Sequence, residues 1–380
     1  MEELRRRFEE GAVVAGTLSG TSADGIDVVL ARLRARAGVL ADLETIAFSV
    51  EPFPEPVRAR LRATLDGATC GLRESALLSR DLGRAFGRAA REAAARAGAA
   101  LDLVASHGQT VWHHDGAEAS GAATLQLGDG DFVAEEAGCA VASDFRQRDV
   151  AAGGEGAPIS ALADDLVFQA APRPCAILNL GGMANLTVLG RAGELAAFDT
   201  GPAGSLLDGL ARRLLGAPFD TGGERALAGR ADERLVVRFL EHPFFARTPP
   251  KSTGRDTFGE SWVGDFAAAA GRAGAADALA SAVELVAASV ALALERFVRD
   301  SPRRLLVCGG GVENRALIAA LARRTALPVA SSAEVGVDPK AREALVFAVL
   351  GARCALGIPS THPGATGARA GKVLGKLSWR

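Results

Sequence analysis

The feature that most constrains this sequence is segment 16–27, which reads GTLSGTSADGID. An apolar run over 12–15 leads into it, and a second apolar run over 26–30 leaves it. Two apolar runs joined by a turn rich in Gly, Ser and Thr are typical of a β-hairpin. Small residues at the tip would let backbone N–H groups surround an anion. The segment therefore predicts a phosphate-binding tip, with an ordinary solvated turn as the alternative.

Two aspartates in this turn narrow the kind of ligand that it could bind. Asp24 and Asp27 would repel a bare phosphate, because like charges repel one another. They suit such a site if a divalent cation, or water bound to it, lies between them and the phosphate. We therefore predict a site for metal-bound polyphosphate, formed by Gly20, Thr21, Ser22, Ala23, Asp24, Gly25, Ile26 and Asp27.

The same plan occurs a second time in the chain. Segment 175–189 reads CAILNLGGMANLTVL, which is again an apolar strand, a glycine turn and an apolar strand. The two hairpins lie roughly 165 residues apart, which is close to the length of one domain. We interpret the pair as a structural duplication, although short similarities of this kind also arise by chance.

Composition and charge limit the classes of protein to which this chain could belong. The chain has 380 residues, of which 48% are hydrophobic and 23% are charged, as expected for two globular domains. Its 43 Lys and Arg nearly balance its 45 Asp and Glu, so no global basic field would attract nucleic acid or an anionic membrane. Its five cysteines form no C-x-x-C pair, which indicates free thiols in a reducing compartment.

The sequence predicts neither a secretion signal nor a membrane span. Residues 1–10 read MEELRRRFEE and lack the apolar core of a secretion signal. The most apolar later stretch, 285–294, is too short to cross a bilayer. We therefore predict a cytoplasmic protein that binds neither nucleic acid nor membrane.

Strand-like and helical segments alternate along the rest of the chain, which predicts an α/β fold with partly parallel sheets. We predict an N-terminal domain over 1–165 and a C-terminal domain over 166–357, with 358–380 able to pack back on the first. Strands are expected at 43–50, 102–111, 124–128, 140–144, 197–202 and 304–308, and helices at 73–97, 275–299, 313–322 and 341–356.

Two polar turns in the second half are candidate parts of an active site. Gly309, Gly310 and Gly311 follow a strand and open a helix, whose N-terminus carries a partial positive charge that favours an anion. Together with the hairpin tips, they predict a nucleotide held between two domains. Asp199 ends a strand-like run, where the active sites of α/β proteins collect. It could accept a proton during phosphoryl transfer, or it could only form a turn beside Gly-Pro.

A group of polar residues in the first half allows two interpretations. His107 and Gln109 lie close in sequence to His113 and His114, which could indicate a metal site. No third ligand follows at useful spacing, and the neighbouring residues carry amides and hydroxyls. We therefore favour a polar substrate pocket over a zinc site.

Three further segments also keep two interpretations open. The loop PPKSTGRD could bind substrate or phosphate through Lys251 and Arg255, or its cations could simply be solvated. The glycine-rich connection 144–158 between the halves could line the cleft or act as a hinge, or it could be a plain flexible linker. Glu343 could face the cleft or pair with Lys340.

Together these segments resemble the anhydro-N-acetylmuramic acid kinase family, which belongs to the acetate and sugar kinase/Hsp70/actin superfamily. The resemblance extends from residue 16 to about 357. It rests on motifs that occur in this order: SGTSADGID (19–27), SHGQTV (106–111), DFR (144–146), NLGGMANLT (179–187), DTGP (199–202), PPKSTGRD (249–256) and CGGG (308–311).

The resemblance implies two RNase H-like domains with ATP in the cleft between them. It implies an enzyme that adds water across the 1,6-anhydro bond of anhydro-N-acetylmuramate and transfers the ATP γ-phosphate to O6, in cell-wall recycling. Asp199 would deprotonate the attacking water, Mg²⁺ would accompany ATP near Asp24 and Asp27, and the protein would form a homodimer. The nucleotide would contact 20–27, Gly181, Gly182, Asn185, Gly309, Gly310 and Gly311, and the sugar would contact His107, Gln109, Arg146 and Glu343.

Three positions depart from the pattern of the family. Glu155 occupies the place of the glutamine in the usual GGQGAP, while AGS at 203–205 and FGE at 258–260 replace segments in which GN and FN are common. The added carboxylate at 155 could repel a sugar that itself carries a carboxylate. Two alternatives therefore stay open: a kinase of the same superfamily that acts on another amino sugar, and a non-enzymatic, nucleotide-gated module like actin or Hsp70.

Overall fold

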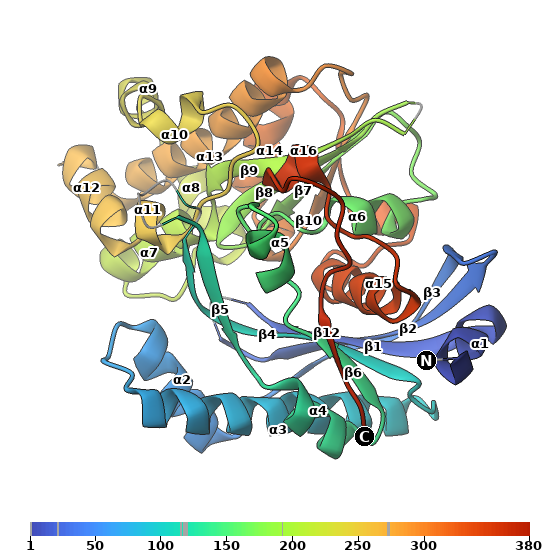
Figure 1. Cartoon of the computed structure of the whole chain (residues 1–380). Helices are drawn as coiled ribbons and strands as arrows, with labels where there is room; N and C mark the ends of the chain where they lie inside the picture. Colours follow the sequence, from blue (N-terminus) through green and yellow to red (C-terminus); the bar gives the residue numbers. More distant parts are fainter. Residues whose placement is uncertain (1, 21–22, 115, 117–120, 192, 272–273) are drawn as a thin grey trace. The chain divides into compact units, whose positions relative to one another are not determined.

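The computed structural model describes residues 2–20, 23–114, 116, 121–191, 193–271 and 274–380. These residues form two compact units. The first unit comprises 1–169 together with 341–380, and the second comprises 170–340. The first unit is therefore discontinuous in sequence, because the chain leaves it after 169 and returns at 341 (Figure 1).

The first unit is built on a mixed sheet in the strand order β12-β6-β4-β1-β2-β3, with β5 paired to β4. Neighbours β1, β2 and β3 are antiparallel, whereas β4 is parallel to both β1 and β6. The strands are β1 (Ala12–Ser19), β2 (Ile26–Arg36), β3 (Val39–Glu51), β4 (Leu103–His114), β5 (Ala123–Leu127), β6 (Ala140–Ser143) and β12 (Lys376–Ser378); the helices are α1 (Glu2–Glu10), α2 (Glu55–Leu65), α3 (Leu72–Arg96), α4 (Gly130–Ala137), α5 (Gln147–Ala151), α6 (Ala161–Val167), α15 (Arg342–Leu356) and α16 (Pro363–Thr366).

The second unit contains a five-stranded sheet in the order β11-β10-β7-β8-β9. Here β7, β8 and β9 are antiparallel neighbours, and β10 is parallel to both β7 and β11. The strands are β7 (Cys175–Leu180), β8 (Met183–Leu189), β9 (Leu195–Pro202), β10 (Leu305–Cys308) and β11 (Val329–Ser331); the helices are α7 (Gly204–Leu215), η1 (Thr221–Gly223), α8 (Glu224–Ala228), α9 (Glu233–Leu240), α10 (Pro243–Ala246), α11 (Arg255–Phe258), α12 (Glu260–Ala270), α13 (Ala275–Phe297), η2 (Gly310–Glu313), α14 (Arg315–Thr325) and η3 (Ser332–Val335).

The two sheets repeat one topology. In each unit, three successive antiparallel strands are followed by two parallel strands that add beyond the first strand, giving β3-β2-β1-β4-β6 and β9-β8-β7-β10-β11. This is the strand order of the RNase H-like fold that the resemblance implies. The predicted α/β duplication is confirmed, and each copy opens with one of the two glycine-rich hairpins.

In the first unit, α3 and α15 cover opposite faces of the sheet (Figure 1). Successive strand residues point to opposite faces, so Ala15 packs with the core under α3, whereas Gly16 lies against α15. A Cβ at Gly16 would come within 2.0 Å of the Ala344 carbonyl oxygen. The absence of a side chain at Gly16 therefore lets α15 approach the sheet directly.

The position of α15 differs from the predicted domain limits. Segment 341–356 was expected in a second domain over 166–357, but α15 packs on β1, β2 and β4 of the first unit. A buried ion pair between Arg342 and Asp164 joins its first turn to α6, with 2.9 Å between Arg342 Nε and Asp164 Oδ1. Hydrophobic periodicity identifies a helix but contains no information about which sheet it covers.

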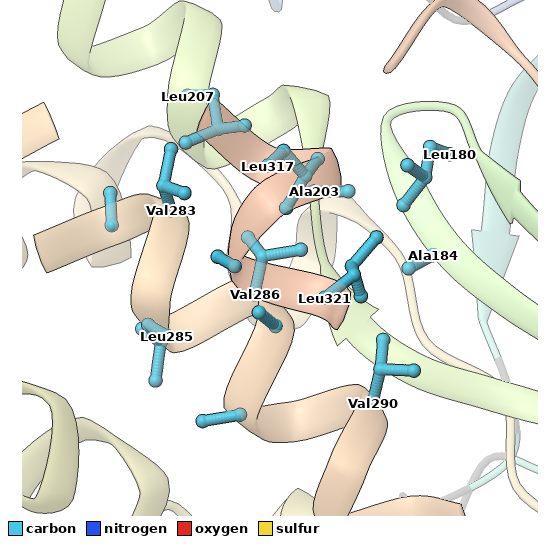
Figure 2. Close-up of a cluster of buried hydrophobic side chains, with 14 of the residues drawn as sticks. Leu180, Ala184, Ala203, Leu207, Val283, Leu285, Val286, Val290, Leu317 and Leu321 are labelled. Atoms are coloured by element: carbon cyan, nitrogen blue, oxygen red, sulfur yellow. The ribbon is translucent and has the colours of Figure 1, made fainter. Parts of the chain in front are cut away.

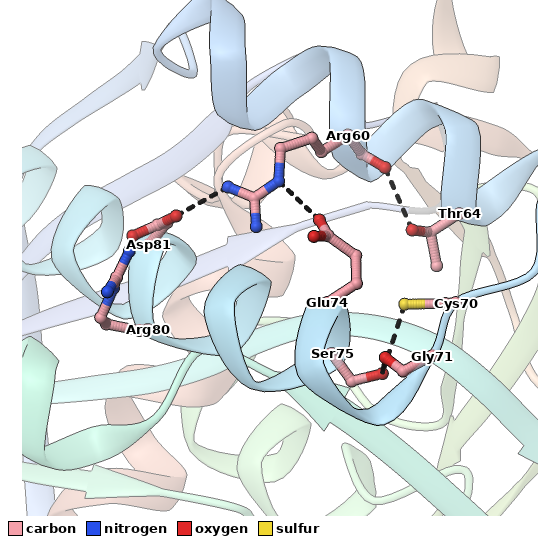
Figure 3. Close-up of polar contacts among 8 residues, drawn as sticks. All are labelled: Arg60, Thr64, Cys70, Gly71, Glu74, Ser75, Arg80 and Asp81. Atoms are coloured by element: carbon pink, nitrogen blue, oxygen red, sulfur yellow. Dashed lines mark hydrogen bonds and ion pairs between the residues drawn. The ribbon is translucent and has the colours of Figure 1, made fainter.

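Helix α2 is fixed to α3 by a group of charged residues on the surface of the first unit (Figure 3). Arg60 donates to Glu74 Oε1 over 2.6 Å and to Asp81 Oδ2 over 2.7 Å. Arg80 also donates to Asp81, over 2.9 Å. Since one guanidinium connects two positions on α3, the orientation of α2 is defined relative to that helix.

The core of the second unit lies around α13. Val283, Val286 and Val290 recur at helical spacing and pack with Leu317 and Leu321 of α14, as Figure 2 shows. Within the described parts of the chain, α13 is the one helix long and apolar enough to cross a bilayer by length and composition. Of the most apolar 18-residue stretch of α13, 78% is buried inside the protein, as in the core helix of a globular unit.

Candidate active site

The first hairpin tip joins β1 to β2, which pair up to Leu18 and Asp27. Ala23 is buried in the left-handed region, with φ of 51°, and its N–H donates to the Gly20 carbonyl over 3.1 Å. A Cβ at Gly25 would come within 2.7 Å of a Val50 methyl group. Of the predicted polyphosphate residues, Thr21 and Ser22 lie outside the described residues.

The other predicted tip residues differ in burial and in their polar partners. The Ile26 side chain is 1% exposed and belongs to the hydrophobic core, so only its backbone could reach a ligand. Asp24 is exposed and accepts a hydrogen bond of 2.9 Å from Arg62 of α2. No sequence motif indicates Arg62, because the pair joins positions that lie far apart in the chain.

Asp27 is influenced by the charge of a second carboxylate. Its side chain on β2 is half-buried, and burial together with the nearby charge of Glu343 raises the pKa of Asp27 to about 7. Glu343 lies in the first turn of α15, while Lys340 Nζ lies 2.6 Å from Glu313 Oε1. A half-buried carboxylate whose ionised form is disfavoured by burial and by the charge of a second carboxylate is suited to binding a cation.

His107 and Arg146 form a buried pair in the first unit. Burial and the positive charge of Arg146 lower the pKa of His107 well below its usual range, so its ring is neutral near pH 7. Its Nε2 accepts a hydrogen bond of 3.0 Å from Arg146 Nε, and its ring packs against Phe347 of α15 at 4.4 Å. Arg146 also donates to the Gly156 carbonyl over 2.8 Å. The histidine thereby orients the guanidinium.

Gln109 connects the predicted sugar segment to the predicted phosphate tip. Its side chain is fully buried on β4, and its Nε2 donates to the Gly20 carbonyl over 3.2 Å. Its Oε1 is buried and accepts no hydrogen bond from the residues that the structure describes. An acceptor of this kind is costly to bury unless another group supplies a donor. Gln109 therefore both holds the tip and offers an acceptor beside it.

The connection 144–158 is an ordered part of the first unit. Asp149 of α5 is fully buried; it accepts hydrogen bonds from Gly156 N over 2.9 Å and from Thr366 Oγ1 over 2.8 Å. Glu155, the departure from the family pattern, donates through its N–H to the Thr366 carbonyl over 2.8 Å. This segment was expected to connect the halves, as a cleft-lining or hinge region or as a plain linker, but it does not connect them, because the chain leaves the first unit only after 169.

In the second unit, the C-terminal ends of β7, β9 and β10 lie at one edge of the sheet, because these strands run in the same direction. The turn Gly181–Gly182 follows β7, and Gly309 follows β10. A Cβ at Gly309 would lie 2.6 Å from the Leu180 carbonyl oxygen, and one at Gly311 would lie 2.5 Å from Leu180 Cβ. The two predicted glycine turns are therefore adjacent. They lie at the C-terminal ends of their strands, where open α/β sheets bind ligands.

Asp199 lies on β9, opposite Asn185 of β8, and is 6% exposed. Its carboxylate Oδ2 accepts a hydrogen bond of 2.9 Å from Thr253 N, and its own N–H donates to the Lys251 carbonyl over 3.1 Å. A hydrogen bond from a backbone N–H favours the ionised carboxylate. The candidate base is therefore held by the PPKSTGRD loop.

The structure corrects one interpretation of that loop. Lys251 was expected either to bind substrate or phosphate as a cationic arm or to be solvated, yet its side chain is 1% exposed. Its ammonium lies over the rings of Phe244 and Phe297. The Phe-rich segment 243–245 is the signal in the sequence that could have indicated a binding place for this cation.

Residues 12–379 match the family model described as anhydro-N-acetylmuramic acid kinase. The chain belongs to the anhydro-N-acetylmuramic acid kinase family.

Relatives in this family are similar along nearly their whole length. One from Gloeobacter violaceus is 40% identical over 372 residues, covering 96% of this chain and 98% of the relative. Another, from Xanthomonas oryzae pv. oryzae, is 42% identical over 367 residues, which cover 95% of this chain and 96% of the relative. A third, from Salinibacter ruber, is 40% identical over 390 aligned positions, which cover 99% of this chain and 98% of the relative. All three are named anhydro-N-acetylmuramic acid kinase.

Solved structures outside the family are more distant. The activator of the 2-hydroxyisocaproyl-CoA dehydratase from Clostridium difficile, with bound ADPNP, has 16% identity and a TM-score of 0.40, covering 90% of this chain and 94% of its own. The ROK hexokinase from Thermus thermophilus has 15% identity and a TM-score of 0.33, and the match covers 89% of this chain and 96% of the hexokinase chain. At these scores neither likeness contributes to the functional argument.

Proposed function

We propose that this protein is an ATP-dependent kinase that opens the 1,6-anhydro ring of anhydro-N-acetylmuramic acid with water and phosphorylates O6. The products are N-acetylmuramate 6-phosphate and ADP, and the reaction belongs to cell-wall recycling in the cytoplasm. Relatives at 40–42% identity over nearly the full chain support this activity. The single structural observation that carries it is the buried Asp199 carboxylate, oriented by Thr253 N beside a glycine-lined sheet edge.

Asp199 acts as the general base in this proposal. Its carboxylate takes a proton from the water that attacks the anomeric carbon, a role that contributes roughly 10²–10⁴-fold to rate. The C1–O6 bond breaks as the ring opens, and O6 then attacks the γ-phosphorus while ADP leaves. Because Thr253 N holds Oδ2, the carboxylate keeps its orientation during the proton transfer.

The nucleotide is bound through backbone groups in this proposal. In the second unit, Gly181, Gly182 and the turn over 309–311 expose main chain at the C-terminal ends of β7 and β10. In the first unit, the tip over 20–27 supplies backbone N–H groups to the phosphates. Asn185 lies opposite Asp199 on the neighbouring strand and is close enough in register to assist in positioning a ligand.

The described residues are compatible with Mg²⁺ held jointly by protein and phosphate. They contain no group of three or more His, Cys, Asp or Glu that could enclose a metal by themselves. Mg²⁺ is usually bound by one or two carboxylates together with substrate phosphates. Asp27 beside Glu343 fits that role better than Asp24, which pairs with Arg62. When bound, the ion neutralises charge on the phosphates.

The sugar contacts the polar residues of the first unit. Arg146, oriented by His107 and the Gly156 carbonyl, supplies a cation suited to a sugar that carries a carboxylate. Gln109 and Glu343 supply hydrogen-bonding groups near the tip. Family resemblance further leads us to infer a homodimer, which light scattering coupled to gel filtration would measure.

The activity is tested by incubating the protein with Mg-ATP and a panel of amino sugars, with mass detection of products. We expect anhydro-N-acetylmuramate to gain one phosphoryl group and one water. Phosphorylation of N-acetylglucosamine without reaction of the anhydro sugar would favour the other amino-sugar kinase. Tight ATP binding without turnover of any sugar would favour the nucleotide-gated module.

A further inference from the structure

Lys251 is a fully enclosed lysine that the proposed chemistry leaves without a role. Its Nζ lies 4.6 Å from the ring centroid of Phe244 and 4.7 Å from that of Phe297. It also donates a hydrogen bond of 3.3 Å to the Phe244 carbonyl oxygen. Lysines are almost never fully buried unless they have partners, and two ring faces attract an ammonium electrostatically. The cage therefore accommodates the charge at this position.

The backbone around the same lysine holds Asp199. The Lys251 carbonyl accepts from Asp199 N over 3.1 Å, and Thr253, two residues further along, donates through its N–H to Asp199 Oδ2 over 2.9 Å. The loop is thus bonded to β9 through the backbone of Lys251 and of its near neighbour. A shift of this loop would move the hydrogen bond that orients the carboxylate.

The charges that face Lys251 come from three residues. The pKa of Lys251 is lowered to about 8, chiefly by burial; the attraction of Asp199 opposes this shift, and the charges of Arg247 and Arg296 add to it. Asp199 is the acidic member of this set. The ammonium form, which predominates near pH 7, therefore attracts the carboxylate that the mechanism requires in its ionised state.

We propose that Lys251 is a positioning residue for Asp199. The aromatic cage anchors its ammonium, the anchored loop places Thr253 N against the carboxylate, and the positive charge favours the ionised base. The inference rests on the proposed function for the role of Asp199. Lys251 acts without touching substrate, because its side chain is 1% exposed.

The test compares Lys251→Met, which keeps an unbranched side chain without charge, with Lys251→Arg, which keeps the charge. For Lys251→Met we expect kcat to fall roughly 10–100-fold, since small misplacements of catalytic groups have effects of this order, with KM for ATP little changed. Loss of a nearby cation disfavours an ionised carboxylate, so the acid limb of the kcat–pH profile moves to higher pH. In Lys251→Arg the acid limb stays at the wild-type pH.

A control and a second measurement make the result specific. Lys376→Met removes an exposed lysine on β12 and is expected to keep the wild-type profile. Thermal unfolding of Lys251→Met, Asp199→Asn and the double variant measures the coupling of the pair without activity. We expect the double variant to lose less stability than the sum of the single losses.

An unmoved acid limb in Lys251→Met, or additive losses of stability in the cycle, would overturn the inference. These results are distinguishable from failure of the proposed function. If wild-type protein does not turn over the anhydro sugar, the proposed activity fails, while the unfolding cycle still reports whether Lys251 and Asp199 are coupled.

Discussion

At the scale of single residues, the candidate site depends on groups held by their neighbours. Asp199 is oriented by a backbone N–H, Arg146 by a neutral imidazole, and Asp27 is influenced by the charge of Glu343. In each case one partner is distant in sequence. The residue types could be predicted from their motifs, whereas their charge states follow from burial and from these partners.

Asp199→Asn tests the general base directly. The amide cannot accept the proton from water at neutral pH, so we expect turnover to fall by roughly 10²–10⁴-fold. ATP binding should persist, because the glycine turns are unchanged. ADP release measures turnover, and titration calorimetry measures binding. Asp42→Asn, on the exposed face of β3, is the control; near-normal turnover of Asp199→Asn would contradict the assignment.

His107 predicts a pH dependence of stability. Its pKa is well below the usual value in the folded protein, so unfolding takes up a proton below about pH 6.5. The stabilisation from the neutral ring is complete above that pH and is lost as pH falls towards the folded pKa. We expect the melting temperature of His107→Gln to fall less steeply between pH 7.5 and 5 than that of the wild type. Parallel curves of melting temperature against pH for the two proteins would exclude a contribution of His107 to this pH dependence.

At the scale of elements, the contact between α15 and the first sheet depends on small residues. A Cβ at Gly351 would come within 2.4 Å of Ala105 Cβ, so Gly351→Ala must displace the helix. Overpacking of this kind costs about 1–3 kcal/mol of unfolding free energy. Denaturant unfolding measures the loss. Gly371→Ala, where a Cβ would meet only ordinary contacts, should be nearly neutral; equal effects would argue against close packing.

Element prediction succeeded where patterns were local. The helix predicted at 73–97 is α3 (Leu72–Arg96), and the hairpin predicted at 175–189 is β7 with β8. The helices between β9 and α13 were not predicted, since 204–270 contains several short elements separated by Gly and Pro. Consequently the position of Phe244 of α10 beside Lys251 was also missed.

At the scale of the whole molecule, the second unit is an insertion into the first. We propose that 170–340 forms an independent domain, since its sheet is covered by helices of its own. Expressed alone, it should unfold cooperatively by circular dichroism. Fragment 1–169 lacks α15, which leaves one face of its sheet uncovered, and it should aggregate or melt without cooperativity. Cooperative unfolding of 1–169 would contradict these limits.

The sequence by itself determined the two hairpins, the glycine turns and the α/β class, because turn chemistry and hydrophobic periodicity act over a few neighbouring residues. Tertiary structure alone decided that α15 covers the first sheet, that Lys251 is buried among aromatic rings and that Asp27 meets Glu343. These features arise from contacts between segments far apart in the chain. Burial and Coulomb interaction depend on such contacts, so no local pattern specifies them.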